Sequence, residues 1–380
     1  MTAGPIVFDL GRLMAEIEAL SRFSDAPQPA VTRILYSPTD LAARAYLRTL
    51  VEAAGFGWRE DAIGNTFMRW AGADPTLPAI ATGSHIDAVP FAGKYDGVVG
   101  VLGALEALRA LKQSGFQPVR PLEIILFTAE EPTRFGLGCV GSRALAGVIG
   151  PSELAALRDG DGLDFDTVRQ AAGFHGDLAG VRLPPAHYAG FVELHVEQGP
   201  LLAAQAIPIG VVTAISAATT VIVTFTGDGG HAGTVLMAER RDALPAAAEL
   251  ALMVEQAAAT HPAGSVVATV GIFDVHPGAS NSIPARVRMS IDVRDVDMTV
   301  RDRLLAEFAH AAETIAAQRQ LHCEFEIVNS DQTVHCDPQI VAAISQAAAQ
   351  YGLSSLPLAS RAYHDTVFMA RICPVGMIFV

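Results

Sequence analysis

The stretch "LPAIATGSHIDAVPFAGKYDGVVGVLGALEALRALKQSG", residues 77–115, decides the fold. It begins with a short apolar run after a proline, typical of a buried strand, and ends with apolar residues at helical spacing before a glycine. A second apolar run, "RPLEIILFTAEE" at residues 120–131, is the next predicted strand. Strand, helix and strand at this spacing form a βαβ unit, which predicts a largely parallel sheet.

Three polar residues interrupt the small and apolar residues of this stretch: His85, Asp87 and Asp96. Burying an unpaired carboxylate costs several kcal/mol or more, so a metal ion is the natural compensation. We expect Asp87 to accept a hydrogen bond from His85 and fix its tautomer, and Asp96 to fold back toward His85 on a glycine-flanked loop. The alternative is a buried His–Asp hydrogen bond beside an ordinary turn aspartate.

Further candidate groups follow along the chain. The adjacent Glu130 and Glu131 stand at a predicted strand end, where one would bind metal and the other would act as a base, unless they form an exposed acidic turn. Glu193, His195 and Glu197 alternate along an extended segment, which could also be a solvated edge strand.

A histidine also lies in a glycine-rich segment. His231 has four glycines close by, and such a segment offers little packing for a core histidine, which favours a functional role. The alternative is a histidine in a flexible turn. Histidines and carboxylates together suit zinc, manganese or cobalt better than calcium. They predict a hydrolytic site with two metal ions.

The length and texture of the chain predict two domains. At 380 residues it exceeds the roughly 250–300 at which single cores stop growing. Three strand-like segments, "TTVIVTFTGDGG", "GSVVATVGIFDV" and "ARVRMSIDVRD", and two long helical patterns, at residues 241–259 and 300–319, separate two regions in which strand and helix patterns alternate. We therefore expect an α/β fold, with a mostly parallel-sheet metallohydrolase domain at 1–212 and 331–380 and a smaller inserted α+β domain at 213–330.

Composition excludes several classes of protein. A hydrophobic content of 51% with 17% charged residues is typical of a packed globular protein. The 26 basic and 40 acidic residues give a net charge of −14, which argues against a nucleic-acid partner. The first residues lack a signal-peptide pattern, no apolar run reaches the roughly 20 residues of a membrane span, and the four cysteines are scattered. We expect a cytoplasmic protein that binds no membrane.

The motifs, taken in order, resemble a known enzyme family. "GSHIDAVPFAGKYDGVVG", "FTAEEPTRFG", "ELHVEQGP", "GGHAGTVLM", "NSIP…IDVRD" and "SRAYHDTVFMA…GMIFV" are similar to those of the hydantoinase/carbamoylase family, which is M20 metallopeptidase-like. Its members are metal-dependent amidohydrolases that act on N-carbamoyl and ureido groups. The resemblance implies a homodimer, with the inserted domain serving for dimerisation or as a lid.

The resemblance also implies roles for individual residues. The matching metal ligands are His85, Asp96 (bridging), Glu131 and His195. Glu130 matches the general base, so we expect its pKa to be raised. The remaining matches are His231 for oxyanion stabilisation, Asn281 and Arg294 with Gln198 for substrate binding, and His364 with Asp365 as a pair for which a structural hydrogen bond is favoured. For Arg294 the alternative is a surface salt bridge.

The implied reaction is hydrolysis of the ureido or carbamoyl C–N bond of a small carboxylate. Ureidoglycolate is the expected substrate, because "GTVLM" replaces the "GTTPM" usual in carbamoylases. An N-carbamoyl-L-amino acid or allantoate is the alternative. The non-enzymatic alternative is a catalytically degenerate dimeric binding protein.

One family feature lies outside the sequence. The last metal ligand of the family is a histidine in a "GxSH" motif just beyond "GMIF", and the sequence ends at Val380. We therefore expect one of the two divalent ions, zinc or manganese with cobalt as a further option, to be bound poorly in this form.

Overall fold

The computed structural model describes residues 4–262 and 264–380, and the chain forms two compact units. The first unit comprises the chain up to Thr213, together with Cys336–Leu358 and His364–Val380. The second comprises Ala214–His335 and Ala359–Tyr363. The segment 359–363, which returns to the second unit, was not expected from the sequence.

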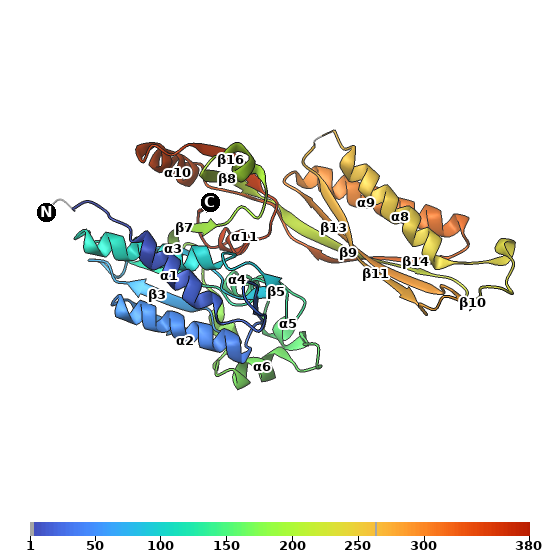
Figure 1. The fold of residues 1–380 in the computed structure, drawn as a ribbon, viewed down its shortest axis with the longest axis horizontal. Coiled ribbons are helices and arrows are strands. Elements are labelled where there is room, and N and C mark those ends of the chain that lie inside the picture. The colour runs from blue at the N-terminus through green and yellow to red at the C-terminus, as the bar shows by residue number, and fades with distance from the viewer. Residues whose placement is uncertain (1–3, 263) are drawn as a thin grey trace. The chain divides into compact units, whose positions relative to one another are not determined.

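The first unit is built on a mixed sheet (Figure 1) in the order β8-β17-β7-β4-β6-β3-β2. The bounds are β2 Gly57–Glu60, β3 Thr66–Trp70, β4 Ala79–Ser84, β6 Leu122–Leu126, β7 Tyr188–His195, β8 Ile209–Ile215 and β17 Val375–Phe379. Strands β17, β7, β4 and β6 are parallel, whereas β8, β3 and β2 pair antiparallel with their neighbours. The sheet is therefore mixed rather than mostly parallel, with the β2–β3 hairpin antiparallel to β6 at one edge and β8 antiparallel to β17 at the other.

The predicted βαβ unit is confirmed. Strand β4, helix α3 (Val98–Gln113) and the parallel strand β6 follow one another. Helices α1 (Leu10–Ser21) and α2 (Pro38–Ala53) pack with α3 on the sheet through a core that includes Leu20, Leu47 and Leu105. Strand β1 (Val31–Arg33) pairs with β5 (Ala88–Ala92), and β16 (Ser355–Ser360) pairs with β8. Further helices are α4 Val140–Leu145, α5 Pro151–Ala156, α6 Phe165–Ala171, α7 Leu201–Gln205, α10 Pro338–Gln350 and α11 Thr366–Met369.

The second unit is an antiparallel sheet with two helices on one face. Its strand order is β11-β13-β9-β14, with β9 Ala217–Thr226, β11 Val267–His276, β13 Arg286–Asp295 and β14 His322–Ser330. Helices α8 (Ala243–Ala259) and α9 (Met298–Gln318) bury Leu250 and Phe308 against this sheet. Three strands and both helices match the sequence prediction, and β14 was missed. A short ladder pairs β10 (Gly230–His231) with β12 (Ser282–Ile283).

None of the helices in the described ranges is both long and apolar enough to cross a membrane.

Candidate metal centre and active site

The site lies where β4 and β6 of the first unit end. Strand β4 stops at Ser84, whose carbonyl oxygen accepts a hydrogen bond from the N–H of Phe127 after β6. A Cβ atom on Gly83 would overlap the backbone oxygen of Ile125, so only glycine allows the two strands to approach this closely. His85 therefore follows directly from the sheet, on the loop after the end of β4.

A second glycine brings the Asp96 loop against His85. Gly97 has a φ of 63°, in the left-handed region, at the start of α3. A Cβ atom at this position would lie 2.5 Å from Nε2 of His85. The sequence Asp96-Gly97 thus allows the backbone to touch the imidazole and places the Asp96 carboxylate beside it.

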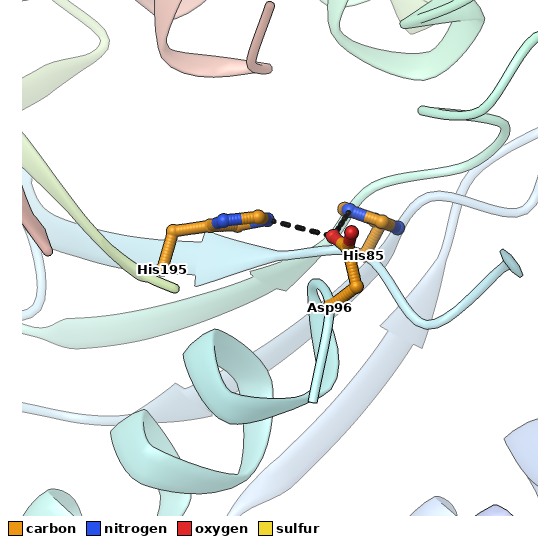
Figure 2. A group of neighbouring side chains, drawn as sticks. All are labelled: His85, Asp96 and His195. Carbon is orange, nitrogen blue, oxygen red and sulfur yellow. Dashed lines mark ion pairs between the residues drawn. The ribbon is translucent and has the colours of Figure 1, made fainter. Parts of the chain in front are cut away.

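Three side chains from distant parts of the sequence converge here (Figure 2). Oδ1 of Asp96 lies 3.2 Å from Nε2 of His195 and 3.6 Å from Nε2 of His85. The two imidazole rings are stacked with their centroids 5.8 Å apart, and both histidines are 1% exposed. His195 is the last residue of β7.

The hydrogen bonds of the two rings place the proton of each neutral imidazole on Nδ1. Nδ1 of His85 lies 3.0 Å from the backbone oxygen of Asp87, and Nδ1 of His195 lies 2.9 Å from that of Val196. A carbonyl oxygen can only accept, so in each neutral ring the proton is on Nδ1 and Nε2 has the lone pair. In addition, Nε2 of His195 accepts a hydrogen bond from the N–H of Gly97 at 3.2 Å.

Asp96 adds a buried carboxylate oxygen to these two ring nitrogens. Its Oδ1 is buried and has no hydrogen-bond partner among the described residues. Two imidazole lone pairs and one carboxylate oxygen thus point toward one another. A divalent cation satisfies all three, and the mixed nitrogen and oxygen set fits zinc or manganese.

The electrostatics favour positive charge at the same point. Burial lowers the pKa of His85, but the carboxylates of Glu130 and Asp87 outweigh it and hold this pKa well above its usual range. Burial raises the pKa of Asp96, but the His195 and His85 imidazoles outweigh it and hold this pKa well below its usual range. The protein without a cation therefore stabilises a proton where a metal ion would supply the charge.

Asp87 holds the loop of the two glutamates rather than the His85 ring alone. Its carboxylate accepts hydrogen bonds from the backbone N–H of Glu131 at 3.0 Å and of Glu130 at 3.4 Å. The same carboxylate lies 3.6 Å from Nδ1 of His85, so the closer contact of that ring is with the Asp87 backbone. A single buried residue thus fixes both the imidazole and the segment after β6.

Glu130 faces the group of three. Its Oε2 lies 3.7 Å from Nε2 of His85, and the residue is 9% exposed. Burial raises the pKa of Glu130 well above its usual value, as the sequence predicted. Burial also raises the pKa of Glu131 to about 7, although Glu131 is not one of the three groups that converge within 4.8 Å.

A second set of potential ligands overlaps the first. Glu193, His195 and His364 also bring one ligand atom each within 4.8 Å of one another. The Glu193 carboxylate, however, already accepts hydrogen bonds from Ser84 at 2.8 Å and from the Thr366 hydroxyl at 2.5 Å. Glu193 therefore links β7 to neighbouring segments. From the sequence it was recognised only as a carboxylate on the same face as His195.

Four other candidates near this site contact identified neighbours. Nε2 of Gln198 donates to Oδ2 of Asp96 at 2.6 Å, which orients the carboxylate. The buried Asp365 accepts a 2.5 Å hydrogen bond from Ser142, and the His364 ring lies edge-on to His195 at 4.6 Å. Glu197 lies beyond the end of β7 and accepts from the N–H groups of residues 201 and 202, at the start of α7.

The remaining candidates belong to the second unit. His231 and Asn281 line a cavity of about 400 Å³ together with His276 and Ser282. The N–H of Gly233 donates to Nδ1 of His231 at 3.1 Å, so the neutral ring has its proton on Nε2.

Arg294 is engaged within its own unit. Its Nε donates to Oδ1 of Asp292 at 2.7 Å, and its guanidinium also donates to the backbone oxygen of Arg361 at 3.1 Å. The salt bridge considered as an alternative is therefore present, and a substrate carboxylate would compete with Asp292 for this guanidinium.

Comparison with known proteins shows the family. The family described as Peptidase family M20/M25/M40 matches residues 81–380, and the chain belongs to it. The chain is 50% identical over 388 aligned residues to the ureidoglycolate hydrolase of Arabidopsis thaliana, covering 100% of this chain and 81% of the relative. It is 36% identical to the N-carbamoyl-L-amino acid amidohydrolase of Geobacillus stearothermophilus, in an alignment that covers 97% of this chain and 90% of the relative.

A solved structure agrees with the fold. The crystal structure of AtUAH in complex with glyoxylate superposes with a TM-score of 0.91 at 50% identity, covering 99% of this chain and 90% of that chain. The resemblance to amidohydrolases of ureido and carbamoyl groups is confirmed.

Proposed function

We propose that the protein is a metal-dependent amidohydrolase that cleaves the ureido C–N bond of a small carboxylate, with ureidoglycolate as the substrate. The observation that carries the proposal is the convergence of two imidazole lone pairs and the unpartnered Oδ1 of Asp96, with the buried carboxylate of Glu130 next to them. A structural role for these residues gives no reason to leave that oxygen without a donor.

His85, Asp96 and His195 would hold the cation, and Glu131 would add a ligand for a second one. The bound ions would lower the pKa of a water molecule and polarise the carbonyl of the ureido group. Glu131 lies on the segment after β6, whose backbone N–H groups donate to the Asp87 carboxylate. A carboxyl with a pKa of about 7 gives up its proton readily to a divalent cation near neutral pH.

Glu130 would move the proton. A base with a raised pKa removes a proton from the attacking water and then carries it as the neutral acid. Delivery of that proton to the leaving nitrogen breaks the C–N bond and returns Glu130 to the carboxylate. A degenerate binding protein has no need of a base at this position. The presence of Glu130, buried beside the group of His85, Asp96 and His195, therefore supports catalysis.

The second unit would supply the groups that recognise the substrate. The His231 ring has its proton on Nε2 and could donate to the oxygen that becomes negative in the transition state. Asn281 and Arg294 are proposed to bind the substrate carboxylate and its polar substituent. We also propose that the protein acts as a homodimer.

Ureidoglycolate is favoured over the other ureido and carbamoyl acids by similarity. The 50% identity to a ureidoglycolate hydrolase exceeds the 36% identity to an N-carbamoyl-L-amino acid amidohydrolase. The second candidate is hydrolysis of an N-carbamoyl-L-amino acid or of allantoate by the same groups.

A substrate panel tests the proposal. Ammonia release is measured from ureidoglycolate, allantoate and several N-carbamoyl-L-amino acids, with the protein loaded in turn with manganese, zinc and cobalt. We expect the highest kcat/KM on ureidoglycolate. No turnover of any ureido or carbamoyl acid with any of the three metals would overturn the proposed activity, and a preference for a carbamoyl amino acid would reassign the substrate.

A further inference from the structure

The buried thiol of Cys139 lies against the proposed base. Sγ of Cys139 is 3.7 Å from Oε1 of Glu130, within the range of an S–H···O hydrogen bond, and Cys139 is 0% exposed. The other oxygen of the same carboxylate, Oε2, is the one that faces Nε2 of His85. The thiol and the imidazole therefore contact opposite oxygens of one carboxylate.

The backbone around the thiol is held in an uncommon conformation. Cys139 and Ala129 each have a φ of 55°, in the left-handed region that residues other than glycine rarely adopt. Ala129 precedes Glu130 in the chain, and Cys139 is hydrogen-bonded to Glu130 through the backbone. Such residues persist where the surrounding structure over-determines them, often at functional sites.

Three consecutive backbone hydrogen bonds lock these two segments together. The N–H groups of Cys139, Val140 and Gly141 donate to the carbonyl oxygens of Glu130, Ala129 and Thr128, at 2.9, 3.0 and 2.8 Å. This ladder fixes the Cα atoms of residues 130 and 139 relative to each other. The remaining freedom of the Glu130 side chain is rotation about its own bonds, which the thiol contact restricts.

We propose that Cys139 is a positioning residue, whose thiol donates a hydrogen bond to Oε1 of Glu130 and thereby keeps Oε2 directed at the group formed by His85, Asp96 and His195. The inference rests on the proposed function, since Glu130 is its base. A thiol suits this position because a neutral, weakly donating side chain can be buried at low cost beside a carboxylate that must exchange a proton.

Enzyme kinetics test the role. In the metal-loaded protein we expect Cys139→Ala to lower kcat about tenfold with KM unchanged, because a displaced base loses part of its catalytic effect without altering substrate binding. Cys139→Ser keeps a donor on a shorter side chain and should recover part of the lost kcat. Unchanged kcat in Cys139→Ala, or a rise in KM alone, would overturn the proposal.

A matched control separates positioning from packing. Cys373 is also buried, at 7% exposed, and its Sγ lies 3.8 Å from a backbone oxygen, that of Met369. Cys373→Ala removes the same atoms from the same unit and should leave kcat unchanged. An equal loss of kcat in both alanine variants would show that buried packing is responsible, and would overturn the proposal.

A spectroscopic measurement is independent of turnover. The infrared S–H stretching band of Cys139, isolated as the difference between wild type and Cys139→Ala, should lie at lower frequency than that of a free thiol. Glu130→Leu removes both acceptor oxygens and should move this band toward the free-thiol frequency. If the alanine variant fails to fold, the difference between wild type and Glu130→Leu gives the same test. A band unaffected by Glu130→Leu would exclude the hydrogen bond, whereas absent turnover with a shifted band would count against the proposed function alone.

Discussion

Oδ1 of Asp96 lies 3.2 Å from Nε2 of His195, and the neutral His195 ring has no proton on that nitrogen. The proton of the His195 ring is on Nδ1, where it meets the Val196 carbonyl oxygen. In that form two lone pairs face each other, and either a metal cation or a second proton on the ring compensates them. This relationship makes the group of His85, Asp96 and His195 a candidate metal site on chemical grounds that do not depend on similarity.

Removal of the metal should abolish activity and lower stability. A ligand that binds only the folded state stabilises it by about 2.7 kcal/mol at a concentration of 100 Kd. We expect a chelator to eliminate ammonia release and lower Tm, and added manganese or zinc to restore both. Asp96→Asn should lose bound metal by elemental analysis, and a variant that retained full metal content would contradict the assignment of Asp96.

Glu130→Gln should separate catalysis from metal binding. We expect kcat to fall by about 10²–10⁴-fold, the usual contribution of a general base, with metal content unchanged. Elemental analysis and steady-state kinetics on the same preparation check both quantities. Turnover at the wild-type rate would remove Glu130 as the base.

Metal affinity should increase as pH rises through about 7. Because burial raises the pKa of Glu131 to about 7, ionisation of this carboxyl destabilises the metal-free fold. Its contribution to stability is thus present below the unfolded pKa of about 4.3 and lost as pH rises through 7.

A cation that uses Glu131 must displace its proton. Displacement of this proton should contribute about a tenfold fall in affinity per pH unit below 7, in addition to displacement of the His85 proton, as measured by metal titration at several pH values. Glu131→Gln should reduce this slope, and an unchanged slope would show that Glu131 is not a ligand.

Gly97→Ala should damage the site from the backbone. The added Cβ atom would lie 2.5 Å from Nε2 of His85, at a φ of 63° that alanine adopts poorly. We expect a loss of about 1–3 kcal/mol in the free energy of unfolding, together with weaker metal binding. Gly93→Ala, in the same loop and with nothing within 4 Å of its Cβ position, is the control that should retain both properties.

Arg294 can be tested as a carboxylate clamp with a paired variant. Arg294→Ala should raise KM with little change in kcat if the guanidinium binds the substrate carboxylate. Asp292→Ala removes the competing partner at 2.7 Å and should leave KM equal or lower. A fall in kcat alone in Arg294→Ala would contradict the clamp.

The sequence predicted the parts of the fold that depend on local pattern. The βαβ unit from β4 to β6 and the helices α8 and α9 follow from apolar spacing. The mixed order of the sheet did not, since apolar runs look alike in parallel and antiparallel strands. Strand β14 carries charged residues along an exposed face, which obscured it.

The same division applies to the site. Motif order and strand ends predicted that His85, Asp96 and His195 meet, and the structure brings them together. Tertiary hydrogen bonds decided the rest. Glu193 is engaged by Ser84 and Thr366, from distant segments, and no pattern in the sequence announces such a pairing. Cys139 was likewise noted only as a scattered cysteine, because its contact with Glu130 depends on a left-handed backbone.

The position of β17 constrains the order in which the protein can be assembled on the ribosome. This strand pairs with β7 on one side and β8 on the other, yet it is synthesised after the whole inserted unit. Until it emerges, the edge of β7 that ends at His195 has no partner at the positions Phe191–His195. The inserted unit has its own core and can fold first, while the nascent first unit exposes a bare strand edge that is open to mispairing.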